Sequence, residues 1–135
     1  WTKPVTMGPE PAHPRRERII VADPDARSRA AAAGALRAAG YAVTEAATGH
    51  EAEAAFWAEP NTELLVAAVG LPGVGGPRLA SVLRALRPGL KVLLLLEDGT
   101  PPDRREEDAA GLRVIRRPLG VDGLPAAVRD VLGSR

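Results

Sequence analysis

Short apolar runs along the chain indicate β-strands. Residues 64–69 and 92–96 are continuously apolar, as is typical of parallel strands that helices cover on both faces. The runs at 18–22, 41–45 and 112–116 are less apolar, and turn residues follow the first of them at Asp-Pro-Asp. With Lys91 included at the start of the fourth run, we predict five strands.

Segments of helical character lie between the predicted strands. Residues 26–39 are nearly all helix formers, and Gly40 follows as a C-terminal stop. Residues 51–58 carry apolar side chains at helical spacing. Residues 77–87 and 124–132 each carry apolar positions at i, i+3, i+4 and i+7, the pattern of an amphipathic helix.

The segment before the last predicted strand gives a weaker signal. Residues 101–110 open with two prolines, which suit the first turn of a helix, but offer only alanines for burial. We expect a short or mobile fourth helix there. The alternation of strand and helix predicts an α/β fold of the (βα)5 type. Its doubly wound parallel sheet would have the flavodoxin-like order 2-1-3-4-5 and right-handed crossovers.

Composition narrows the classes of function. A length of 135 residues suits one domain, and 18 Lys and Arg against 17 Asp and Glu give no electrostatic reason to expect a nucleic acid or a membrane surface as partner. The absence of cysteine excludes disulfides and thiolate nucleophiles and fits a reducing compartment. The apolar runs are far shorter than the roughly 20 residues of a membrane helix. We therefore expect a cytoplasmic domain.

The first residues differ in composition from the rest. Residues 1–16 contain four prolines and no apolar run, so we expect a disordered leader or the remnant of a tag. Residues 17–135 form the predicted domain.

The predicted topology brings several strand ends together. In doubly wound sheets, ligands bind at the carboxyl ends of the strands, next to the switch point between the first and third strands. The residues that fall there are Asp23, Ala68, Leu96, Arg117 and Pro118.

Four segments carry a resemblance to a known family. They are residues 19–25 (IIVADPD) with Arg29 six residues after Asp23, residues 38–41 (AAGY), residues 71–76 (LPGVGG) and residues 117–119 (RPL). In this order and spacing they resemble the receiver (CheY-like) domain of the response regulators of two-component systems. The resemblance extends from about residue 18 to residue 132.

The resemblance also identifies departures from the family pattern. The phosphoryl-accepting aspartate, four residues before the proline matched by Pro72, falls on Ala68. Of the two acids that hold Mg²⁺, Asp23 matches the first, whereas Pro24 stands at the second and Asp25 is offset along the turn. A methyl group cannot form an acyl phosphate, and one carboxylate is a poor Mg²⁺ site.

Three further positions depart from the pattern. The hydroxyl residue at the end of the fourth strand falls on Leu96, the conserved lysine of the family falls on Arg117, and the aromatic switch residue falls on Val114. Pro72 and Pro118 fix the register on both sides. With these departures, the resemblance implies a degenerate pseudo-receiver without enzymatic activity, cofactor or metal.

Such a domain would act as a regulatory or protein–protein interaction module in bacterial signal transduction. The candidate partners are a second copy of the chain, another signalling protein and a neighbouring domain of the same chain. Two faces could bind them: the last helix with residues 103–110, or the last helix with residues 26–39. Candidate contact residues are Arg104, Arg105, Val114, Arg116 and Arg129.

Other interpretations of the same residues remain open. Asp23 and Asp25 could form a metal or acid site, although an Asp-Pro-Asp turn with an N-cap acid is favoured. Arg117 could bind an anion or form a structural ion pair with Asp23. The glycines of 73–76 suit a phosphate loop less well than a plain turn, because no Lys-Ser/Thr follows them.

These residues also define an alternative function. A flavodoxin-like domain could bind a nucleotide or another small ligand at the strand ends, using Asp23, the 70–76 loop and Arg117. The sequence shows no phosphate-binding glycine pattern after the first strand, which favours the interaction module.

Overall fold

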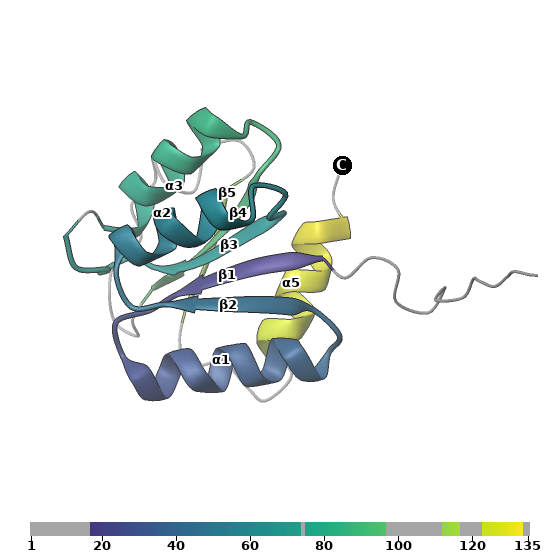
Figure 1. Cartoon of the computed structure of the whole chain (residues 1–135). Helices are drawn as coiled ribbons and strands as arrows, with labels where there is room; N and C mark the ends of the chain where they lie inside the picture. Colours follow the sequence, from purple (N-terminus) through teal and green to yellow (C-terminus); the bar gives the residue numbers. More distant parts are fainter. Residues whose placement is uncertain (1–16, 74, 97–111, 117–122, 134–135) are drawn as a thin grey trace, which may run out of the picture.

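Five parallel strands form the central sheet of the computed structural model, which describes residues 17–73, 75–96, 112–116 and 123–133 (Figure 1). The strands are β1 (Arg18–Ala22), β2 (Ala42–Ala46), β3 (Leu64–Ala68), β4 (Lys91–Leu96) and β5 (Leu112–Arg116). Their order is β2-β1-β3-β4-β5, and every neighbouring pair is parallel. The predicted fold class and strand order are confirmed.

Helices cover both faces of this sheet. The described helices are α1 (Ala26–Ala38), α2 (Gly49–Ala58), α3 (Gly76–Leu86) and α5 (Gly123–Gly133). α1 and α5 pack on one face, and α2 and α3 on the other (Figure 1). The predicted leader at 1–16 and the predicted helix within 101–110 lie outside the described residues.

Alternation along the strands produces two hydrophobic layers. Side chains of successive strand residues point to opposite faces, so Ile20 and Leu65 join the layer under α2 and α3, whereas Ile19 and Leu64 join the layer under α1 and α5. All five side chains of β3 are buried. Its continuous apolar sequence therefore follows from its central place in a sheet with two covered faces.

Several observed element boundaries differ from the predicted ones by one or two residues. The largest difference is at α2, which begins at Gly49 rather than at residue 51. Thr48 is its N-cap: Oγ1 of Thr48 accepts from the amide of Glu51 (3.1 Å), and the Glu51 carboxylate accepts from the amide of Ala47 (2.7 Å). This reciprocal arrangement is a variant of the capping box, so the Thr-x-x-Glu spacing was the available signal.

The other shifts are single residues at the ends of elements. β2 starts at Ala42 because the Tyr41 amide still bonds to the Leu36 carbonyl in the turn after α1. α1 ends at Ala38, β3 ends at Ala68 and α3 runs from Gly76 to Leu86, each one residue from the prediction. None of the described helices has the length and apolar character needed to cross a bilayer.

Candidate functional site

The sheet brings the predicted site residues of the first, third and fourth strands together at the carboxyl ends of these strands. In the register of β1 and β3, Ala22 lies opposite Ala67, so the residues that follow them, Asp23 and Ala68, end neighbouring strands. Ala68 in turn pairs with Leu95 of β4, directly before Leu96. Residues from distant parts of the chain therefore meet at the switch point, as the topology predicted.

Asp23 is the only charged residue among the fully buried positions of the described chain, with 2% of its surface exposed. Its Oδ1 accepts from the amide of Asp25 (3.0 Å), its carbonyl accepts from Nη1 of Arg29 (2.9 Å), and its amide donates to the Ala46 carbonyl (2.9 Å). A buried carboxylate is tolerated when hydrogen bonds replace its hydration. Asp23 thus fastens the turn between β1 and α1.

Asp25 is the N-cap of α1, as the favoured interpretation predicted. Its backbone is extended, and its side chain accepts from the amide of Arg27 (3.3 Å) and from Oγ of Ser28 (2.8 Å). These bonds, first of all the one from the Ser28 hydroxyl, lower the pKa of the exposed Asp25 carboxyl below its ordinary value. Its role here is to start a helix.

The loop after β3 folds back over Ala68. The Leu71 amide donates to the Ala68 carbonyl (3.3 Å), and the Gly76 amide donates to the Val69 carbonyl (3.1 Å). A Cβ on Gly76 would lie only 2.4 Å from the Ala68 carbonyl oxygen. Because only glycine lacks a Cβ, this close approach explains the glycine at position 76.

The donor set at the strand ends does not fit Mg²⁺. Mg²⁺ requires several oxygen ligands in near-octahedral geometry, but Ala68 contributes a methyl group, Leu96 an alkyl chain and Pro24 no side-chain oxygen. One oxygen of Asp23 already accepts from a backbone amide. Within the described ranges, no three His, Asp or Glu side chains gather in a group that could hold a metal ion.

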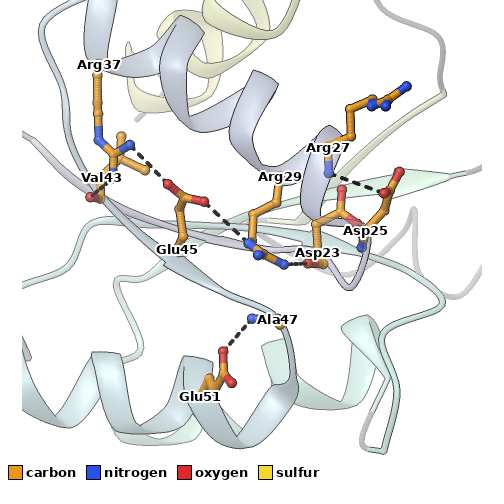
Figure 2. Close-up of polar contacts among 9 residues, drawn as sticks. All are labelled: Asp23, Asp25, Arg27, Arg29, Arg37, Val43, Glu45, Ala47 and Glu51. Carbon is orange, nitrogen blue, oxygen red and sulfur yellow. Dashed lines mark hydrogen bonds and ion pairs between the residues drawn. The ribbon is translucent and has the colours of Figure 1, made fainter.

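A cluster of charged residues joins α1 to β2 (Figure 2). Glu45 on β2 accepts from Nε of Arg29 (3.4 Å) and from Nη1 of Arg37 (3.1 Å), and both arginines come from α1. Of these three residues, only Arg29 belongs to a segment that the sequence pattern singles out for the family resemblance. The available signal was the separation of the two arginines by about two helical turns, which places them on one side of α1.

The predicted partner-face residues are only partly described. Arg104, Arg105, Arg117 and Pro118 lie outside the described residues, and Arg116 ends β5. Val114 packs against the layer under α2 and α3, whereas Arg129 is exposed on α5 at the opposite face. A surface that contains both would have to wrap around the β5 side of the sheet. The partner face stays a prediction.

A surface depression lies on α5, away from the carboxyl ends of the strands. Its volume is about 420 Å³, it is widely open, and the described residues that line it are Ala126, Arg129, Asp130 and Gly133 of α5. Nζ of Lys91, at the start of β4, donates to the carbonyl of Val131 (3.2 Å). This half of α5 therefore lies at the amino ends of the strands, opposite the edge where the sequence predicted a ligand.

The similarity of this chain to known proteins is found at the level of structure. No protein-family model matches the sequence, and no curated protein matches it at a significant level. The chemotaxis protein CheY4 of Vibrio cholerae superimposes with a TM-score of 0.77 at 21% identity, over 87% of this chain and 99% of that one. A CheY-like response regulator receiver domain protein of Methanospirillum hungatei JF-1 gives 0.76 at 25% identity, over 87% and 94%.

The chain has the receiver-domain fold. A response regulator receiver domain protein of Clostridium thermocellum agrees, with a TM-score of 0.75 at 18% identity over 86% of this chain and 94% of that one. These comparisons cover 86–87% of this chain and 94–99% of the receiver domains. In this fold Asp23 and Ala68 lie at the switch point of the sheet.

Proposed function

We propose that this chain is a receiver domain that does not accept a phosphoryl group and acts as a protein-binding regulatory module in two-component signalling. One observation carries the proposal: the side chain that ends β3 is the methyl group of Ala68, 5% exposed, beside the buried Asp23. The acceptor of a phosphoryl group in this fold, as the family resemblance implies, is a carboxylate at that position.

The chemistry of the neighbouring positions supports the same conclusion. Formation of an acyl phosphate requires a carboxylate oxygen as the nucleophile, and a methyl group has no lone pair to attack with. Leu96, 2% exposed, places an alkyl chain where the resemblance assigns a hydroxyl. The metal that would neutralise the transferred charge also lacks ligands. The phosphoryl acceptor, the hydroxyl residue and one metal ligand of the family pattern are thus replaced by Ala68, Leu96 and Pro24.

The retained acid has a different use in this proposal. The side chain of Asp23 holds the turn before α1 by accepting from the Asp25 amide, so a role in folding accounts for this acid without phosphoryl transfer. Without phosphorylation, the conformation is set by partner binding, by dimerisation or by constitutive locking of one state, and a partner shifts the populations only if its affinity differs between two states. Candidate partners are a second copy, another signalling protein or an adjoining domain.

The decisive experiment is intact-mass measurement after incubation with a small phosphodonor and Mg²⁺. We expect the mass of this chain to stay unchanged under conditions in which a receiver domain with an acceptor aspartate gains one phosphoryl group. The Asp23→Asn variant serves as a matched control, because Asp23 is the buried carboxylate nearest in register to Ala68. A phosphoryl gain in the native chain that disappears in Asp23→Asn would overturn the proposal.

A further inference from the structure

β2 is one of the two strands at the ends of the described sheet. β2 ends the strand order, so its only neighbour is β1. The Ala42 amide donates to the Glu17 carbonyl, and the Asp23 amide donates to the Ala46 carbonyl. Because peptide groups alternate in direction along a strand, Ala42, Thr44 and Ala46 bond toward β1, whereas Val43 and Glu45 present their amide and carbonyl groups outward.

Side chains from both flanking helices close this outer edge (Figure 2). Nη2 of Arg37, on α1, donates to the outward carbonyl of Val43 (3.0 Å). The carboxylate of Glu51, on α2, accepts from the amide of Ala47, the residue directly after β2 (2.7 Å). Glu45, between them, is paired with Arg37 and with Arg29. Side chains therefore bond the backbone groups at both ends of this edge, which an added strand would otherwise bond.

The Glu51 contact also caps α2, but ion-pair stability alone does not account for the contacts of Arg37. The Arg37 side chain is 49% exposed, and exposed ion pairs contribute about 0–1 kcal/mol to folding. An open strand edge, in contrast, is a template for pairing with another chain, and proteins protect such edges with charged side chains. The β2 edge is also complementary to itself. A two-fold axis would set two β2 strands antiparallel, with outward amides opposite outward carbonyls.

We propose that Arg37 and Glu51 guard the β2 edge against pairing with β2 of a second copy of this chain. In the native chain these two side chains then disfavour strand addition on this side, although the outward amides of Val43 and Glu45 still face away from β1. Removal of both guards opens the Val43 carbonyl and the Ala47 amide together. Glu45 keeps its contact with Arg29 in that variant, so no charge in the cluster is left without a partner.

The test compares the molecular mass in solution of the native chain and the Arg37→Ala/Glu51→Ala variant over a range of protein concentrations. We expect the variant to double its mass as the concentration rises, through a contact that the native chain does not form. Amide hydrogen exchange identifies the contact: the Val43 and Glu45 amides should become slower to exchange in the associated variant. Both single variants are measured as well, in case the double variant does not fold.

Two controls separate the guard role from a general change of charge. Arg27→Ala removes one exposed arginine from the same helix, and the Arg27 side chain makes no contact with β2 among the described bonds. Glu51→Gln keeps an oxygen that can accept from the Ala47 amide. Both controls should behave like the native chain.

Three outcomes would overturn the proposal. The first is a folded double variant that stays at the mass of one chain at every concentration. The second is association with no slowing of exchange at Val43 and Glu45, which would assign the contact to another face. The third is a native chain that already pairs through β2. None of these outcomes bears on phosphorylation at the strand ends, so the proposed function is tested independently.

Discussion

At the scale of single residues, the site is determined by close contacts around the ends of β1 and β3. Asp23 is buried and hydrogen-bonded, Ala68 is buried and apolar, and Gly76 lies against the Ala68 carbonyl. Each residue type follows from its surroundings. The buried carboxylate of Asp23 accepts a hydrogen bond from a backbone amide, and position 76 requires glycine because the Ala68 carbonyl oxygen leaves no space for a Cβ.

Gly76→Ala should destabilise the fold. Its Cβ would meet the Ala68 carbonyl oxygen at 2.4 Å, and this oxygen belongs to the backbone of a central strand that cannot move aside cheaply. We expect a loss of about 1–3 kcal/mol in the free energy of unfolding, measured by chemical denaturation.

Gly34→Ala is the matched control. A Cβ at Gly34, inside α1, meets nothing within 4 Å, so this change should stabilise the chain by about 0.5–1 kcal/mol through helix propensity. Equal effects of the two substitutions would contradict the packing argument for position 76.

At the scale of elements, the cap of α1 connects the site to the sheet. Asp25 begins the helix, Arg29 in its first turns holds the Asp23 carbonyl, and Arg37 near its end holds the Val43 carbonyl of β2. The same helix therefore fixes the β1–α1 turn at one end and covers the sheet edge at the other. Its sequence is otherwise mostly alanine, so these polar contacts, with the buried Ala33 and Leu36, determine how it sits on the sheet.

Asp25→Ala should lower the thermal stability of the chain in a pH-dependent way. The Ser28 hydroxyl and the Arg27 amide lower the pKa of the folded Asp25 carboxyl below 3.8, its ordinary value. A folded pKa below the unfolded one contributes stability that is present above the unfolded pKa and is lost as the pH falls through the folded pKa. The midpoints of native and variant chains should therefore differ most near neutral pH and converge under acid conditions.

Thermal unfolding followed by circular dichroism at several pH values checks this prediction. Ser28→Ala serves as a control, because it removes the first cause of the lowered pKa and keeps the carboxylate. It should reduce the pH dependence in part. A native–variant gap that stays constant down to the lowest pH would contradict the assignment of Asp25 as an ionised cap.

At the scale of the whole molecule, the strand order determines the free energy that local opening of each strand costs. β3 is central, with β1 and β4 on its two sides and all five of its side chains buried. β2 has one strand neighbour, and Thr44 and Glu45 are exposed on it. Local opening costs least where a segment buries the least apolar surface and keeps the most solvent contact.

Amide hydrogen exchange should rank the strands accordingly. The amides of Leu65 and Val66 in β3 should exchange most slowly, close to the rate of global unfolding, and the outward amides of Val43 and Glu45 in β2 should exchange faster. The measurement on the native chain also gives the baseline for the β2 edge variants. Exchange at Val43 as slow as at Leu65 would contradict an open, singly paired edge.

The sequence alone determined the fold class and the strand order, and it placed Asp23, Ala68 and Leu96 at the carboxyl ends of their strands. This was possible because local patterns carry the information: continuous apolar runs at 64–69 and 92–96 indicate covered parallel strands, and the (βα) alternation leaves few topologies. The identities of Ala68, Pro24 and Leu96 at those ends also required no structure. Boundaries such as the start of α2 were missed because caps depend on side-chain bonds at one or two residues.

Only the tertiary structure decided which side chains meet. The bond of Arg37 to the Val43 carbonyl joins two elements whose relative position depends on how α1 packs on the sheet, and no local pattern states that distance. The same holds for Gly76, whose glycine is explained by a carbonyl eight residues earlier in the chain. Periodicity specifies which face of an element is buried, whereas contacts between elements exist only after the layers have assembled.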